Sequence, residues 1–204
     1  MIAVIDYGVG NLFSLAASLK YIGADSAVTS SPNKIEDSSA IILPGVGAFA
    51  DAYKKLEHSG LIPLLKRQAA AGKPILGICL GMQLLFERSF EYGEHAGLGF
   101  IGGEVRPIAG MVNGGVKVPH MGWNSLIFRQ KSPLFKYLSG GEYVYFVHSY
   151  AATNCVKSVT AVCTYGGAEL TASAESGNVF GTQFHPEKSG AAGLKILRAF
   201  SELK

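Results

Sequence analysis

The organising stretch of this sequence is Lys73-Pro-Ile-Leu-Gly77-Ile-Cys79-Leu-Gly81-Met-Gln83-Leu-Leu-Phe86. Its apolar run from Pro74 to Ile78 predicts a buried strand. The run from Met82 to Phe86 predicts a helix that fades near Phe90. Because only three residues are left between strand and helix, the chain must bend sharply between them.

The middle residue of this bend is Cys79, and Gly77 and Gly81 on either side relieve its crowding. The spacing G-x-C-x-G is the cysteine form of the nucleophile elbow, which lifts one side chain above a parallel sheet. A helix N-terminus favours negative charge, and the thiolate is the attacking form of cysteine. Free cysteine is also among the most buried residue types. Cys79 is therefore either a nucleophile or a packing thiol at a strand end.

Composition narrows the class of protein. The length of 204 residues predicts one domain over 1–204. A content of 48% hydrophobic and 16% charged residues is ordinary for a compact protein. A net charge of +3, dispersed along the chain, gives no reason to expect nucleic acid, and no apolar run is long enough for a membrane span. The first residues enter a strand at once, so no signal peptide is expected. Three cysteines without metal-ligand spacing favour the cytoplasm.

Strands and helices alternate along the first half of the chain. Apolar runs at 2–6, 27–29 and 40–43 predict strands, and apolar residues at helical spacing follow at 12–22, 48–57 and 61–71. This order predicts an α/β fold with a doubly wound, mostly parallel sheet covered by helices on both faces. Short alternating runs from 101 to 177 predict an antiparallel β insertion, before a buried strand at 179–184 and a closing helix at 191–203.

Two glycine-rich turns follow strands. Gly8-Val-Gly10 does not continue as a dinucleotide fingerprint, because Phe13 replaces the third glycine, and no cofactor is expected. Pro44-Gly-Val-Gly47 is either an ordinary strand-to-helix loop or a source of oxyanion donors. In the second case the N–H of Leu80, next to Cys79, would be the partner donor.

A second chemical locus is Phe184-His185-Pro186-Glu187. Residues two apart in an extended segment point to one side, and Pro186 stiffens that geometry. Glu187 could hold one imidazole nitrogen of His185 and orient the other toward a thiol. Both His185 and Cys79 follow predicted parallel strands, whose carboxyl ends form the ligand-binding edge. A lone His-x-Glu can also be a surface accident. No residue group shows metal-ligand spacing, and no carboxylate lies at a useful spacing from His120 or His148.

Together, these segments resemble the three motifs of class I, triad-type glutamine amidotransferases, in order and at fitting separations. The resemblance implies that Cys79 attacks the side-chain amide of glutamine, with His185 moving the proton and Glu187 orienting His185. It implies an oxyanion site at the N–H groups of Val46, Gly47 and Leu80. It also implies that the substrate is contacted by five further residues, which are Gln83, Glu91, His148, Ser149 and Tyr150.

Four further segments resemble the branch of this family that serves histidine biosynthesis: 5–12, 44–49, 119–124 and 145–150. That resemblance implies a heterodimer in which ammonia passes to a (β/α)8-barrel cyclase. Asn11, Trp123 and Tyr145 would face this partner, although Trp123 could instead be a core aromatic. The two glycines after Pro44 suggest an oxyanion strand that reorients when the partner holds its nucleotide.

Other functions remain open at this point. A sugar-amidating paralogue keeps similar motifs, and the glutaminase of pyridoxal phosphate synthase belongs to the same class. A redox sensor with an elbow cysteine would need neither Gln83 nor the pair of His185 and Glu187. Selective labelling of Cys79 by a glutamine-mimicking electrophile would distinguish the amidotransferase from the sensor.

Overall fold

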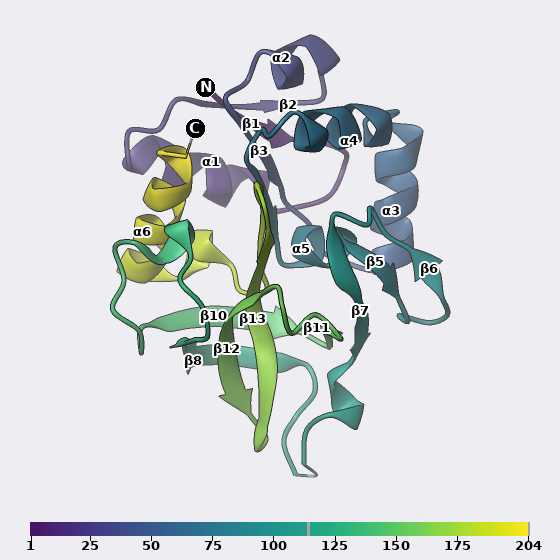
Figure 1. Ribbon diagram of the computed structural model, residues 1–204, viewed down its shortest axis with the longest axis vertical. Coiled ribbons are helices and arrows are strands. Elements are labelled where there is room, and N and C mark those ends of the chain that lie inside the picture. Colours follow the sequence, from purple (N-terminus) through teal and green to yellow (C-terminus); the bar gives the residue numbers. More distant parts are fainter. Residues whose placement is uncertain (114, 204) are drawn as a thin grey trace.

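The computed structural model describes residues 1–113 and 115–203 (Figure 1). Residues 114 and 204 lie outside the described residues, although the expected domain includes both and the expected insertion includes 114. The strands are β1 (Ile2–Ile5), β2 (Ser26–Thr29), β3 (Ala40–Leu43), β4 (Ile75–Ile78), β5 (Phe86–Ser89), β6 (His95–Ala96), β7 (Ile101–Pro107), β8 (His120–Ser125), β9 (Ile127–Phe128), β10 (Tyr143–His148), β11 (Tyr150–Thr153), β12 (Val159–Tyr165), β13 (Ala168–Ser176) and β14 (Val179–Thr182). The helices are α1 (Leu12–Tyr21), α2 (Pro32–Glu36), α3 (Phe49–His58), α4 (Ile62–Ala70), α5 (Leu80–Leu84) and α6 (Gly190–Ser201), with short 3-10 turns η1 (Ile108–Gly110), η2 (Pro133–Phe135) and η3 (Pro186–Lys188).

The central sheet has eight strands in the order β2-β1-β3-β4-β14-β13-β12-β9. The first five strands in this order run parallel, and β13, β12 and β9 extend the sheet antiparallel. Every residue of β1, β3, β4 and β14 is buried, as expected for strands covered on both faces. The predicted α/β class with a mostly parallel sheet is confirmed.

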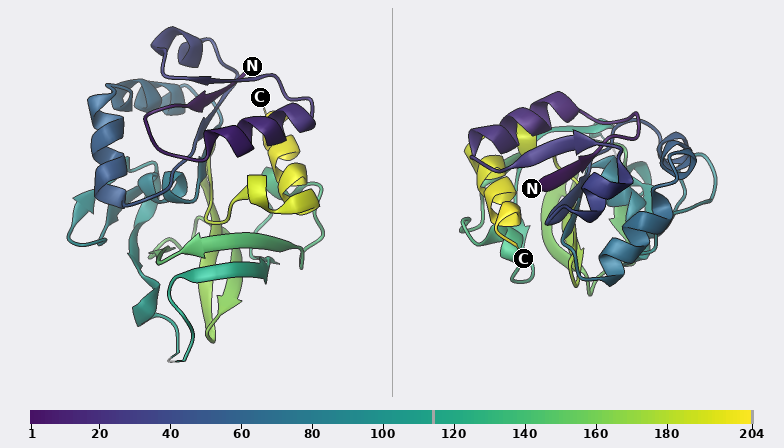
Figure 2. Two further views of the ribbon diagram at one scale, coloured as in Figure 1. Left: turned by 180° about the vertical axis from the view of Figure 1, so that it is seen from behind. Right: turned by 90° about the horizontal axis from the view of Figure 1, so that it is seen from above.

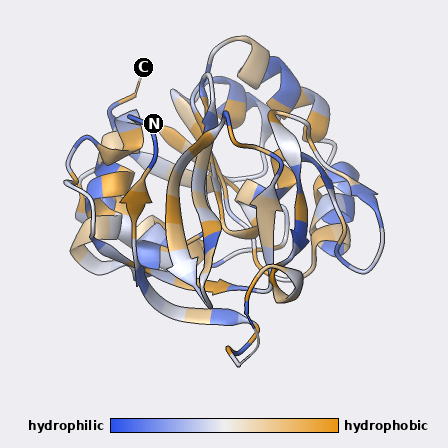
Figure 3. Ribbon diagram, turned by 60° about the horizontal axis from the view of Figure 1, so that its bottom comes forward, coloured by the Kyte–Doolittle hydropathy of each residue, from blue (hydrophilic) through white to orange (hydrophobic). Residues whose placement is uncertain are grey.

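Helices lie on both faces of this sheet. The view from above shows α1 and α6 on one side and α3 and α4 on the other (Figure 2). Each face has its own hydrophobic core: Leu15, Leu19 and Phe200 belong to one, and Phe49 and Leu56 to the other. The central strands are coloured largely as hydrophobic, whereas the outer helices carry both colours (Figure 3). Hydrophobic burial on both faces thus fixes the strands whose ends carry the site.

The helix after Cys79 is shorter than predicted. It ends at Leu84, and Phe86 begins strand β5 instead of a further helical turn. The carbonyl of Leu84 accepts a hydrogen bond from Leu98 N–H, and that of Leu85 accepts one from Phe100 N–H. These carbonyls are therefore taken by a distant segment, and the prediction of a helix reaching Phe90 was wrong.

The segment from 101 to 177 contributes to three sheets. β12 and β13 join the central sheet, β8 pairs with β10, and β7 and β11 join a small sheet with β5 and β6. Most of these pairs are antiparallel, but β5 and β7 run parallel. Short strands thus surround the carboxyl edge of the central sheet.

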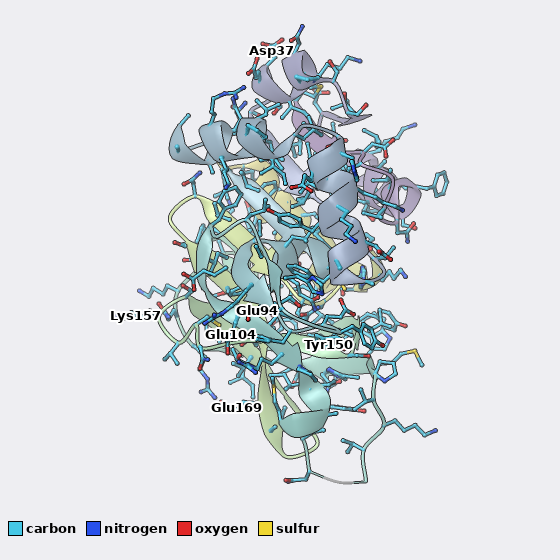
Figure 4. The ribbon with its side chains drawn as sticks, turned by 90° about the vertical axis from the view of Figure 1, so that its right-hand side faces the viewer. Asp37, Glu94, Glu104, Tyr150, Lys157 and Glu169 are labelled. Atoms are coloured by element: carbon cyan, nitrogen blue, oxygen red, sulfur yellow. The ribbon has the colours of Figure 1, made fainter. Side chains whose placement is uncertain are left out.

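Charged side chains brace the small sheet. Arg88 places its Nη1 atom 3.2 Å from Glu94 and its Nε atom 3.1 Å from Glu104. Arg106 lies 2.7 Å from the other oxygen of Glu104 and stacks 3.8 Å from the ring centre of Phe90. Glu94 and Glu104 lie close together on one side of the molecule, near Tyr150 and far from Asp37 (Figure 4). This network joins strands beside the loop that carries Glu91.

Candidate active site

Cys79 occupies a strained turn between β4 and α5. Its φ is 54° and its ψ is −109°, a conformation that residues with a side chain seldom adopt. A Cβ atom on Gly77 would lie 2.6 Å from the carbonyl oxygen of Gly81, and one on Gly81 would lie 1.9 Å from that of Leu43. Only glycine fits these two positions, so the G-x-C-x-G spacing is a steric requirement of the turn.

His185 and Glu187 lie just beyond the end of β14, the strand that pairs with β4. The Nδ1 atom of His185 is 2.8 Å from Oε1 of Glu187, and both side chains are only 3% exposed. Pro186 begins a 3-10 turn, so the two side chains meet across a turn and not along an extended segment as predicted. The other imidazole nitrogen is left for Cys79, which lines the same cavity as His185.

Backbone and side-chain contacts hold this histidine in place. The N–H of His185 donates to the carbonyl of Tyr145 at 3.0 Å. Ser189 Oγ donates to the carbonyl of His185 at 2.6 Å and accepts from the N–H of Tyr145 at 3.0 Å. The position of His185 is therefore fixed both by β14, which it follows, and by contacts with Tyr145 on β10.

Electrostatics favour the charged form of His185. Burial alone would lower its pKa, but the hydrogen bonds and negative charges of Cys79 and Glu187 raise the pKa to about 9. At neutral pH the histidine is then an imidazolium beside the sulfur. Such a pair can attack an electrophilic carbon and afterwards protonate a leaving group.

The thiol and the imidazole share a cavity of about 560 Å³, a size suited to a small molecule. Its lining contains ten of the residues named from the sequence: Val46, Gly47, Cys79, Leu80, Gln83, Glu91, His148, Ser149, Tyr150 and His185. Glu187 lies behind His185 and lines a much smaller cavity together with Asn11. The structure thus brings the expected substrate-facing residues to one place; their roles stay predictions.

The loop after β3 is supported from the loop after β1. Tyr7 donates its hydroxyl hydrogen to the carbonyl of Pro44 at 2.7 Å, and burial, with the charge of Cys79, raises the pKa of Tyr7. A Cβ atom on Gly10 would approach the Pro44 ring to 3.1 Å. Gly47 has a φ of 97°, which favours glycine. The first glycine-rich turn therefore packs against the second.

Gln83 is held by its own side-chain contacts. Its Nε2 atom donates to the carbonyl of Tyr150 at 3.1 Å and to Oε1 of Gln183 at 3.0 Å. Gln183 was not identified from the sequence, yet it is fully buried and its Nε2 atom lies 3.7 Å from the sulfur of Cys79. One sequence signal could have identified Gln183: it is a polar residue within a predicted apolar strand. It also lies two positions before His185, so both side chains would point to the same side of an extended segment.

Glu91 and His148 complete the wall of the cavity, and His120 lies behind His148. Glu91 accepts a hydrogen bond from the N–H of Phe49, at the start of α3. His148 Nε2 lies 3.0 Å from His120 Nδ1, a pairing that the sequence did not indicate. Burial lowers the pKa of His148 to about 4, so this residue is uncharged at neutral pH.

The sequence of this chain is similar to those of known proteins over nearly its whole length. The sequence profile of the glutamine amidotransferase class-I family matches residues 3–202. The chain belongs to that family. It is 49% identical over 203 residues to the imidazole glycerol phosphate synthase subunit HisH of Caldanaerobacter subterraneus subsp. tengcongensis, covering 100% of this chain and 98% of that protein. It is 48% identical over 201 residues to the same subunit of Lactococcus lactis subsp. lactis, covering 98% of each.

Solved structures share the fold of this class I glutamine amidotransferase. A crystal structure of a glutamine amidotransferase aligns with a TM-score of 0.76 at 18% identity, over 100% of both chains. A chain in the structure of PurLQS from Thermotoga maritima aligns with a TM-score of 0.73 at 23% identity, over 98% of this chain and 96% of the other. At these identities the likeness concerns the fold alone.

Three residues of this amidotransferase were expected to face a partner. Trp123 is 52% exposed and is therefore not a core aromatic. It lies opposite Tyr145 in the pairing of β8 with β10, with ring centroids 6.0 Å apart. Asn11 caps α1 by accepting a hydrogen bond from Ser14 N–H at 3.4 Å. Contact of these residues with a partner stays a prediction.

The remaining thiols differ from Cys79 in their surroundings. Cys155 and Cys163 are buried away from the cavity lining, and burial raises the pKa of both, that of Cys163 to about 12. Within 1–113 and 115–203, no group of three or more His, Cys, Asp or Glu residues could hold a metal ion. No helix among these described residues is long and apolar enough to cross a membrane.

Proposed function

We infer that this chain is the glutaminase subunit of an imidazole glycerol phosphate synthase, and that it hydrolyses glutamine to glutamate and ammonia. The observation that carries this inference is the meeting of Cys79 and His185 in one cavity, with Glu187 hydrogen-bonded to the imidazole. Full-length similarity to subunits of that synthase supports the choice of pathway.

The first half of the reaction forms a thioester. The thiolate of Cys79 attacks the side-chain amide carbon of glutamine, and the negative charge moves to the amide oxygen. We assign stabilisation of that oxygen to the N–H groups of Val46, Gly47 and Leu80, residues that line the cavity; such stabilisation is worth several kcal/mol. The imidazolium of His185 then gives its proton to the nitrogen, the carbon–nitrogen bond breaks, and ammonia leaves.

The second half regenerates the enzyme. Neutral His185 accepts a proton from water while the water oxygen attacks the thioester carbon. The carbon–sulfur bond breaks, glutamate is released, and the thiolate–imidazolium pair is restored. Glu187 keeps the imidazole in the orientation that both steps need, because its hydrogen bond fixes Nδ1 and leaves the other nitrogen for the reacting atoms.

Glutamine itself needs polar contacts in the cavity. We assign the amide and amino groups of the substrate to Gln83 and Glu91, and a backbone rim to His148, Ser149 and Tyr150. All five line the cavity with Cys79. The carboxylate of Glu91 suits a positively charged amino group, because it supplies an opposite charge.

The ammonia would serve a partner enzyme. We propose a heterodimer with a (β/α)8-barrel cyclase that contacts Asn11, Trp123 and Tyr145 and uses the ammonia to form imidazole glycerol phosphate. The half-exposed Trp123, packed edge-to-face on Tyr145, has the character of an interface anchor. The complex would then combine glutamine hydrolysis with a lyase-type ring closure.

Co-purification with the barrel cyclase, followed by an assay of glutamate release, tests this function. Glutamate should form rapidly when the cyclase and its phosphoribulosyl-formimino aminoimidazole carboxamide ribotide are both present. Glutamate formed only with the partner of a sugar-amidating pathway or of pyridoxal phosphate synthase would assign the chain to that pathway. No glutamate with any partner would contradict the glutaminase assignment.

A further inference from the structure

The sulfur of Cys79 lies at one end of a continuous chain of polar contacts. Gln183 Nε2 donates to the sulfur at 3.7 Å, and Gln183 Oε1 accepts from Gln83 Nε2 at 3.0 Å. Gln83 Nε2 also donates to the carbonyl of Tyr150 at 3.1 Å. The Tyr150 carbonyl is therefore connected to the nucleophile through two buried amides.

The same carbonyl continues the chain to strand β8. His148 Nδ1 lies 2.8 Å from the oxygen of Tyr150, and His148 Nε2 lies 3.0 Å from His120 Nδ1. His120 Nε2 lies 2.8 Å from Oδ1 of Asn124, whose Nδ2 donates to the carbonyl of Thr164 at 2.9 Å. Asn124 follows Trp123 directly on β8, so the chain ends beside the expected partner contact.

The two ends of this chain determine where the protons lie. Because Asn124 donates to Thr164, its oxygen faces His120, and His120 Nε2 must carry the hydrogen. The carbonyl of Tyr150 likewise requires a hydrogen on His148 Nδ1. In an uncharged pair the two inner nitrogens then face each other with lone pairs at 3.0 Å. Four nitrogens with only two hydrogens cannot satisfy all three contacts.

A third proton would complete the chain, but the surroundings oppose the charge. His120 is fully buried, with the rings of Phe146 and Tyr165 stacked on it at centroid distances of 4.8 and 4.0 Å. Burial lowers the pKa of both histidines, and the charge of His185 lowers that of His148 further. The other titratable groups near the pair are Tyr165 from β12 and Tyr150 from β11, with Cys79, Glu91 and Tyr92 lining the same cavity as His148. At neutral pH one contact is left unsatisfied, and a small shift of β8 or of the Tyr150 carbonyl would relieve it.

We propose that His120 is a positioning residue for glutamine hydrolysis. It transmits the placement of β8, through His148, to the carbonyl of Tyr150, and from there to Gln83 and the sulfur. A partner that moves Trp123 by a fraction of an ångström would thereby change the rim of the glutamine site. This inference rests on the proposed glutaminase function and on the partner contact at β8.

The matched variants are His120→Phe and Tyr165→Phe. The first keeps an aromatic ring between Phe146 and Tyr165 and removes both nitrogens; the second keeps the stacked ring and removes only the hydroxyl that donates to the carbonyl of Lys117. Each variant is assayed as the complex with the barrel cyclase and its nucleotide, after gel filtration confirms assembly. His120→Phe should raise KM for glutamine about tenfold and change kcat less, whereas Tyr165→Phe should leave KM unchanged.

An independent measurement uses the wild-type chain labelled with ¹⁵N at histidine. At neutral pH its spectrum should show hydrogens on His120 Nε2 and His148 Nδ1, and the absence of either would overturn the chain of contacts. This measurement decides the matter if His120→Phe does not fold. If the wild-type complex releases glutamate and both variants have the same KM, only this inference fails. A wild-type complex without glutaminase activity contradicts the proposed function instead.

Discussion

His185 and Glu187 form a buried ion pair: Nδ1 and Oε1 are 2.8 Å apart, and each side chain is 3% exposed. The second oxygen of Glu187 has no hydrogen-bond partner among the described residues, so the contact with His185 is the main compensation for burying the carboxylate. The pair therefore works as a unit, in which the carboxylate fixes the orientation of the imidazole and, together with Cys79, favours its charged form.

Replacement of Glu187 by glutamine tests this unit through the pH dependence of the reaction. In the wild type kcat/KM should fall as the pH rises through about 9, because His185 then loses the proton that ammonia needs. In Glu187→Gln the fall should occur at lower pH, since Cys79 still raises the pKa of His185 but the negative charge of Glu187 no longer does. The maximal kcat should drop about 10²-fold. An unchanged alkaline limb would show that Glu187 does not set the charge of His185.

Replacement of Cys79 by alanine tests whether this residue is the nucleophile or only supports the structure. The assembled complex should lose glutamine-dependent synthesis and keep synthesis from added ammonia, because the cyclase does not need the sulfur. Both rates are measured on the same preparation, with formation of imidazole glycerol phosphate as the readout. A parallel loss of the two rates would mean that Cys79 supports the structure rather than the attack.

The isolated chain should hydrolyse glutamine slowly. Gly47 has a φ of 97° and, as glycine, is free to adopt other backbone conformations. We expect its N–H to point away from the oxyanion in the isolated chain, and a misdirected oxyanion donor costs about 10²–10³-fold in rate. Addition of the cyclase with its nucleotide should restore that factor in a glutamate-release assay. Equal rates with and without the partner would show that the oxyanion site is already formed in the single chain.

Alanine substitutions of two glycines test the steric basis of the elbow. A Cβ atom on Gly81 would lie 1.9 Å from a backbone oxygen, whereas one on Gly102, in β7, meets nothing within 4 Å. Gly81→Ala should lower the free energy of unfolding by about 1–3 kcal/mol or more, and Gly102→Ala should leave it nearly unchanged. Denaturant midpoints of the two variants provide the measurement. Equal midpoints would mean that β3 and α5 can separate without cost.

The features that the sequence predicted are those set by local chemistry. Cys79 could be identified because the glycines two residues away are required by the turn itself, and His185 and Glu187 because they are neighbours in the chain. The mostly parallel sheet, with helices on both faces, followed from alternating strands and helices. That the thiol and the imidazole lie at neighbouring strand ends is consistent with the rule that parallel strands present their carboxyl ends at one edge.

The features that could not be predicted depend on distant segments. The helix after Cys79 stops at Leu84 because Leu98 and Phe100 take its carbonyls, which no local pattern reveals. The contact of Gln183 with the sulfur and the pairing of His120 with His148 join residues that are 104 and 28 positions apart. A polar residue in an apolar strand signals that a partner exists, but not which one.

The position of β14 between β4 and β13 has a consequence for folding. Although β4 and β14 are neighbours in the sheet, the segments from α5 to β13 separate them in the chain, and His185 follows β14. Until it inserts, the sulfur has no proton donor and the sheet is split in two. A folding intermediate without an inserted β14 would therefore hold Cys79 but lack its imidazole, so glutaminase activity should appear only after this long-range pairing has formed.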